Sequence, residues 1–103
     1  MDDTSRPVRS KVVTAIGDLD MDTIGPVAQA LHAAAEAYDV VILDASGITF
    51  ADSSFLNLLL SVHRETLFRI AAPQEQLMRL LEMTGADGVL TLVPTVAGAT
   101  EAA

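Results

Sequence analysis

The amino-acid sequence predicts a single α/β domain with a mostly parallel or mixed sheet and alternating helices. Segments rich in β-branched and aliphatic residues recur along the chain and alternate with segments whose apolar residues keep helical spacing. This alternation is typical of parallel strands joined by right-handed helical crossovers. Residues 40–43, Val-Val-Ile-Leu, are apolar throughout, which is typical of a strand covered on both faces. The 103 residues are enough for one compact domain.

The first half of the chain predicts a strand, a helix and a second strand. Residues 8–16 have the composition of a strand, and residues 17–20, Gly-Asp-Leu-Asp, have the composition of a turn. The spacing becomes helical from Ile24, and either Asp22 or Thr23 can cap that helix. Residues 40–43 predict the next strand, which Ser-Gly at 46–47 interrupts and residues 48–50 resume.

The second half predicts a strongly apolar helix, a strand, a third helix and a last strand. Residues 66–71 and 89–93 have strand composition. Pro73 opens the third helix, whose Leu77, Leu80 and Leu81 point inward and whose C-terminal cap is Gly85. The predicted domain therefore covers residues 8–93, between a flexible leader at 1–7 and a flexible tail at 94–103.

The composition narrows the classes of partner that the chain can bind. Its formal net charge is −8, so nucleic acid and anionic lipid surfaces would repel it, and a basic protein surface is the natural complement. The absence of cysteine excludes disulfides and thiolate metal ligands. We find no secretory signal and no apolar run near the roughly 20 residues that span a bilayer. We therefore expect a cytoplasmic protein that binds neither nucleic acid nor membrane.

An aspartate and two serines stand together where the predicted strand 48–50 gives way to the apolar helix. At about 100° per residue from Ser53, the polar side chains fall within one third of the helix circumference. Both serines begin this polar ridge, so we expect them to be exposed. Orphan N–H groups at a helix start favour an anion by roughly 0.3–1 kcal/mol, so a phosphoserine could be tolerated there. Ordinary capping by Asp52 and the serines is the simpler reading of the spacing alone.

Three stretches, in order, resemble the STAS-domain anti-sigma factor antagonists of bacteria. Residues 17–20, "GDLD", stand where that family has a Gly-Glu-Leu-Asp turn after a strand. Residues 48–54, "ITFADSS", resemble its strand end followed by Asp-Ser-Ser/Thr-Gly. Residues 80–87, "LLEMTGAD", are similar to its last helix, which ends in glycine. The resemblance covers roughly residues 8–93 and implies a single STAS-like domain.

The resemblance also implies a partner-switching function. In that family an anti-sigma factor that is itself a serine kinase phosphorylates the serine after the aspartate, which corresponds here to Ser53. The unphosphorylated antagonist binds the anti-sigma factor and frees the sigma factor, and the phosphorylated form dissociates. The implied protein is not an enzyme and needs no cofactor, because the ATP belongs to the kinase. The partner-binding residues that we expect are Asp20, Asp22, Asp52, Ser53, Ser54, Asn57 and Ser61.

Two other functions compete with this interpretation. The family has glycine after the Asp-Ser-Ser/Thr motif and this chain has Phe55, which leaves open a STAS-like interaction module without phosphorylation, such as an accessory subunit of a transport or sensor complex. A hydrolase would need a nucleophile, a base and an orienting acid. The two histidines, His32 and His63, instead occupy positions typical of amphipathic packing, and no phosphate loop or metal-ligand spacing is present.

Overall fold

The computed structural model describes residues 7–101, which form four parallel strands with helices between them. The strands are β1 (Ser10–Leu19), β2 (Val40–Ala51), β3 (Leu67–Ala71) and β4 (Thr91–Val93), and they pair in the order β1-β2-β3-β4. The fold class predicted from the sequence is thereby confirmed. Most of the predicted leader at residues 1–7 lies outside the described part of the chain.

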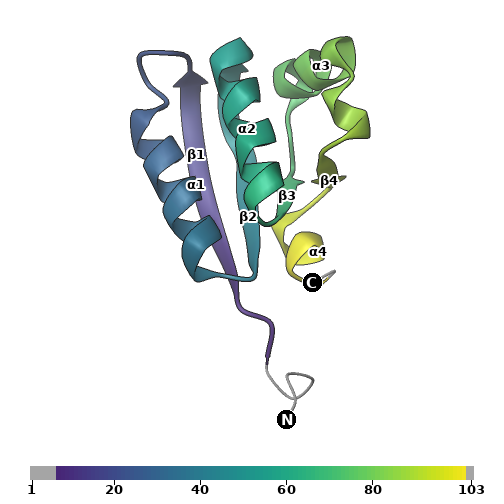
Figure 1. The fold of residues 1–103 in the computed structure, drawn as a ribbon. Coiled ribbons are helices and arrows are strands. Elements are labelled where there is room, and N and C mark those ends of the chain that lie inside the picture. The colour runs from purple at the N-terminus through teal and green to yellow at the C-terminus, as the bar shows by residue number, and fades with distance from the viewer. Residues whose placement is uncertain (1–6, 102–103) are drawn as a thin grey trace.

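Three helices connect consecutive strands and cover one face of the sheet. These are α1 (Gly25–Ala37), α2 (Ser53–Glu65) and α3 (Glu75–Thr84), and their buried residues share a single aliphatic core with one face of the strands (Figure 1). Crossovers of one hand between strands in sequential order all fall on the same side of a sheet. The fold therefore has one helical face and one face with little cover.

The other face of the sheet is covered in part by a short C-terminal helix, α4 (Val96–Glu101). Ala99 of α4 is fully buried against Val40, Ile42 and Ala71. The sequence led us to expect a flexible tail over residues 94–103, and the described part of that segment is instead a docked helix. The small side chains that suggested disorder let α4 approach the sheet closely.

The Gly-Asp-Leu-Asp tetrad is not the turn that its composition predicted. Strand β1 continues through Gly17 and Asp18 to Leu19. Strand β2 accommodates this extension with one extra residue opposite 14–16 and another opposite 17–18. The predicted interruption of β2 at Ser46–Gly47 is wrong for the same reason, since the strand passes through it as a bulge.

Two helix starts and one strand start also differ from the predictions. Ile24 is the N-cap residue of α1, and neither Asp22 nor Thr23 caps it. Helix α3 begins at Glu75, two residues after Pro73, and Ala72 before it has a positive φ of 56°. The last strand begins two residues later than predicted, because a 3₁₀ turn, η2 (Ala86–Gly88), precedes it.

Within residues 7–101, no helix is long and apolar enough to cross a membrane.

Gly85 ends α3 in the left-handed conformation, with φ 79°, as the sequence predicted. A Cβ added at Gly85 or at Gly88 would meet no atom within 4 Å, and of the two only Gly85 has a positive φ. We therefore expect Gly85→Ala to lower the free energy of unfolding by about 1 kcal/mol through backbone strain alone. Gly88→Ala is the matched control and should leave it nearly unchanged.

Thermal unfolding of both variants measures this difference. A loss of about 1 kcal/mol corresponds to a melting temperature lower by roughly 4–8 °C in a domain of this size. Equal melting temperatures for the two variants would show that the left-handed cap contributes nothing to stability.

Candidate protein-interaction site

The residues singled out by the sequence lie at the carboxyl edge of the sheet. Strands β1 and β2 are parallel and end together, so the loop at residues 20–24 and the first turn of α2 lie at the same edge, at the top of the view in Figure 1. The backbone N–H of Asp52 donates to the carbonyl oxygen of Leu19 at 3.3 Å, which joins the two segments directly. Adjacent strand ends thus bring acidic and hydroxyl groups from separate parts of the chain to one surface.

Asp52 caps helix α2. Its Oδ1 accepts hydrogen bonds from the backbone N–H groups of Ser54, at 2.9 Å, and Phe55, at 3.3 Å. These two donors would otherwise be orphaned at the helix start, and a cap of this kind stabilises a helix by about 1 kcal/mol. Of the three residues that the sequence suggested as caps, Asp52 is therefore the one that caps α2.

Ser53 is the first residue of α2 and is exposed. Within residues 7–101, no hydrogen bond to its hydroxyl is found, so the group is not used by the fold that surrounds it. Ser54, the next residue, is half-buried. The exposure expected from the helical wheel is thus observed for Ser53 and only in part for Ser54.

Phe55 points into the core and is fully buried. It belongs to the main aliphatic cluster between the helices and the sheet. Its ring therefore does not project beside the Ser53 hydroxyl. Phe55 therefore fills the core beneath the helix and leaves the surface at Ser53 open.

The polar ridge of α2 continues from Ser53 for two turns. Asn57, one turn further along, is exposed, and Ser61, after another turn, is half-buried. The opposite side of the helix is buried, at Phe55, Leu56, Leu58, Leu59 and Val62. The outer side of α2 is therefore a narrow polar strip, as the helical spacing predicted, and it begins at the carboxyl edge of the sheet.

The loop between β1 and α1 is closed by Asp20 and Thr23. Oδ1 of Asp20 accepts from the backbone N–H groups of Asp22, at 2.9 Å, and Thr23, at 3.1 Å. The Thr23 hydroxyl accepts from the Asp20 N–H at 2.9 Å and donates to the carbonyl oxygen of Asp18 at 2.8 Å. Asp20 therefore holds the loop in shape, whereas Asp22 and its neighbour Met21 are exposed.

Gln76 positions the strand end that precedes Asp52, a contact that the sequence analysis did not predict. Its side-chain amide accepts from the Ala51 N–H at 2.9 Å and donates to the Ala51 carbonyl oxygen at 3.1 Å. The pair of bonds ties the first turns of α3 to the last residue of β2. A lone glutamine in a helix has no distinguishing pattern, so only the fold reveals this contact.

The histidines are not arranged around a serine. His32 on α1 has its Nδ1 2.9 Å from Oε1 of Glu65 at the end of α2, and both side chains are about 40% exposed. His63 is half-buried, and the pocket that it lines includes Arg69 and Thr91, away from the carboxyl edge of the sheet. Within residues 7–101, no group of three or more His, Asp or Glu side chains could hold a metal ion.

A family model described as "Mlab, STAS domain" matches residues 3–94. The chain belongs to the STAS-domain family. Two of the solved structures that resemble its fold are anti-sigma factor antagonists. An anti-sigma factor antagonist from Mycobacterium paratuberculosis has 30% sequence identity and a TM-score of 0.81, over 90% of this chain and 84% of that one. The anti-sigma factor antagonist SpoIIAA, in its unphosphorylated form, has 19% identity and a TM-score of 0.76, over 93% of this chain and 89% of that one.

The structural match to both antagonists extends over at least 90% of this STAS domain. The family membership that the three sequence motifs indicated is confirmed. The likeness to SpoIIAA, at 19% identity, shows the fold alone. Among curated protein sequences, none matches the chain.

Proposed function

We propose that this STAS domain is an anti-sigma factor antagonist that binds an anti-sigma factor with serine kinase activity and is released when Ser53 is phosphorylated. The observation that carries the proposal is the exposed, unused hydroxyl at the first position of α2. A relative with 30% identity that is an anti-sigma factor antagonist supports the same role. The domain itself would act by binding, and the kinase would supply the ATP.

Access to Ser53 is the first requirement of this function. In the transfer, the serine Oγ would form a bond to the γ-phosphorus of ATP while the bond from that phosphorus to the β–γ bridging oxygen breaks. ADP would leave, and the hydroxyl proton would pass to a base of the kinase. The structure favours this step because Asp52 performs the capping and the Ser53 hydroxyl can leave its position without breaking a bond of the fold. The buried ring of Phe55 does not obstruct the approach of a kinase to this surface.

Tolerance of the phosphate is the second requirement. A phosphoserine carries a charge of about −1.5 to −2 at neutral pH. At the start of α2 it would lie near the positive end of the helix dipole, which favours an anion by roughly 0.3–1 kcal/mol. The domain should therefore remain folded after phosphorylation, and the modification would act on binding.

Release of the partner is the third requirement. Ser53, Asn57 and Ser61 lie along one strip, with Asp22 exposed on the neighbouring loop. A partner that packs on this strip would desolvate the Ser53 hydroxyl. A phosphate in its place would add charge beside existing carboxylates and occupy the space of the contact, and an unpaired charge in a desolvated interface costs several kcal/mol.

Intact mass spectrometry tests the phosphorylation step. The purified domain is incubated with ATP and the serine-kinase anti-sigma factor that is proposed as its partner. We expect a mass gain of one phosphoryl group on the wild-type chain and none on Ser53→Ala. Ser61→Ala, which removes a hydroxyl on the same strip, is the matched control and should be phosphorylated like the wild type.

Two outcomes would contradict the proposal. A mass gain that persists in Ser53→Ala would place the phosphoacceptor elsewhere. No mass gain with the partner kinase, combined with stable binding to it, would make the domain a constitutive STAS-like interaction module, such as an accessory subunit of a transport or sensor complex.

A further inference from the structure

Strand β1 has an open edge over residues 7–101, because it pairs only with β2. It is ten residues long and alternates regularly: Val13, Ala15 and Leu19 face the helices and are buried, while Val12 and Ile16 on the other face are 39% and 72% exposed. A long edge strand with apolar side chains on both faces is a template for pairing with another strand.

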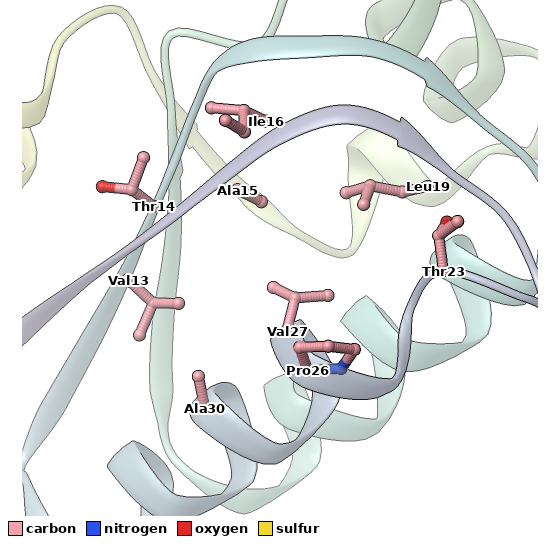
Figure 2. A pocket seen from close by; sticks show the side chains of 9 residues that line it. All are labelled: Val13, Thr14, Ala15, Ile16, Leu19, Thr23, Pro26, Val27 and Ala30. Carbon is pink, nitrogen blue, oxygen red and sulfur yellow. The ribbon is translucent and has the colours of Figure 1, made fainter.

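A groove lies between this edge and helix α1. It consists of two cavities of about 260 and 370 Å³ that share Val13 and Ala30 in their lining. Figure 2 shows Val13 and Leu19 of β1 facing Val27, Pro26 and Ala30 of α1, with Ile16 on the opposite side of the strand. A groove between an edge strand and a helix accepts the alternate side chains of an added strand.

The charges along β1 indicate which strand would fit. Arg9 and Lys11 lie at its beginning, and Asp18 and Asp20 lie at its end. An added strand that runs antiparallel to β1 should therefore carry cations at its own beginning and anions at its end. Strand β1 itself has that pattern.

We propose that β1 pairs antiparallel with β1 of a second copy of this chain, about a two-fold axis at Thr14. The register is selected because opposite residues of an antiparallel pair share a face. With Thr14 opposite Thr14 of the second copy, the exposed Val12 and Ile16 lie opposite each other, and Val13 and Ala15 pair within the groove.

The ends of the strand fit the same register. Lys11 lies opposite Gly17 of the second copy, which has no side chain to obstruct it, and Ser10 lies opposite Asp18. Moving the axis to residue 15 would place Val12 opposite Asp18, and moving it to residue 13 would place Ser10 opposite Ile16. Of these three registers, only the axis at Thr14 places both exposed apolar residues, Val12 and Ile16, opposite apolar side chains.

Sedimentation equilibrium in physiological salt tests the association. The net charge of −8 on each chain opposes it at long range, and this salt screens charges beyond about 8 Å. We expect the wild type to have twice the single-chain mass of 10.8 kDa. A mass equal to that of one chain at all concentrations would show that β1 does not pair with a second copy, and would overturn the proposal. The groove would then be a site for a strand of another protein.

Paired charge substitutions test the register, since both positions are exposed and the fold should survive. Val12→Lys with Ile16→Lys would place like charges opposite each other twice, and should give single chains. Val12→Lys with Ile16→Glu would place opposite charges together twice, and should restore the dimer. Met83→Lys, an exposed apolar residue on α3, is the control and should stay dimeric. A dimer that survives the double lysine variant would overturn the proposal.

A single cysteine provides an independent readout, because the chain has none of its own. Opposite residues of an antiparallel pair have Cα atoms about 4.5–5.5 Å apart, within the range of a disulfide. Thr14→Cys should therefore form a disulfide-linked dimer under mild oxidation. In Val12→Cys the two cysteines would be about 13 Å apart along the strands, and this variant should not cross-link. Cross-linking of both to the same extent would contradict the register.

Discussion

Substitution Ser53→Asp is expected to weaken binding to the anti-sigma factor by at least about tenfold, which corresponds to about 1.4 kcal/mol. The added carboxylate would lie at an exposed position of the polar strip, beside Asp52 and at the same edge of the sheet as Asp22. It carries less charge and fewer acceptor oxygens than a phosphate, so its effect should be smaller than that of genuine phosphoserine. Isothermal titration with the purified partner measures both affinities.

Two controls separate this local effect from a general effect of charge. Ser53→Ala removes the hydroxyl without adding charge and should bind nearly as well as the wild type. Thr91→Asp adds the same charge at an exposed position at the start of β4, the opposite edge of the sheet, and should also retain binding. Equal losses in Ser53→Asp and Thr91→Asp would show that net charge, and not the position of Ser53, controls the affinity.

Substitution Leu59→Asp is expected to unfold the domain. Leu59 is fully buried on the inner side of α2, within the main core. Loss of a buried leucine side chain costs about 2–5 kcal/mol, and an unpaired carboxylate in an apolar site adds several more. The total is comparable with the 5–15 kcal/mol that stabilises a typical domain. Circular dichroism should show loss of the folded signal at room temperature.

Asn57→Asp introduces the same side chain two residues earlier on the exposed side of α2 and should leave the fold intact. Its melting temperature should stay within a few degrees of the wild type, since exposed substitutions usually change stability by less than about 0.5 kcal/mol. A cooperative melting transition in Leu59→Asp would show that this side of the helix is not the buried one.

The periodic parts of the sequence were sufficient to predict the sheet and the faces of the helices. In α2 the alternation of Phe55, Leu58, Leu59 and Val62 with exposed polar residues is strong enough to define both the core side and the ridge. The unbroken apolar run of β2 indicated correctly a strand covered on both faces, by α1–α3 on one side and α4 on the other.

Glycines and small residues predicted turns and a flexible tail at positions where contact with another part of the chain instead determines the structure. Gly17 and Gly47 resemble turn residues in sequence, but both lie in the β1–β2 ladder. A Cβ at Gly47 would lie 2.6 Å from Cγ2 of Ile16, so this glycine permits a close approach of the strands. The contact of Gln76 with Ala51 and the docking of α4 depend on segments distant in sequence, which periodicity does not relate.

Binding of the anti-sigma factor by the domain homogeneously phosphorylated at Ser53 tests the central claim most directly. The account predicts that the unphosphorylated domain binds and that the phosphorylated one, with an unchanged circular dichroism spectrum, binds more than about a hundredfold less tightly. Equal affinity of the two forms would contradict it.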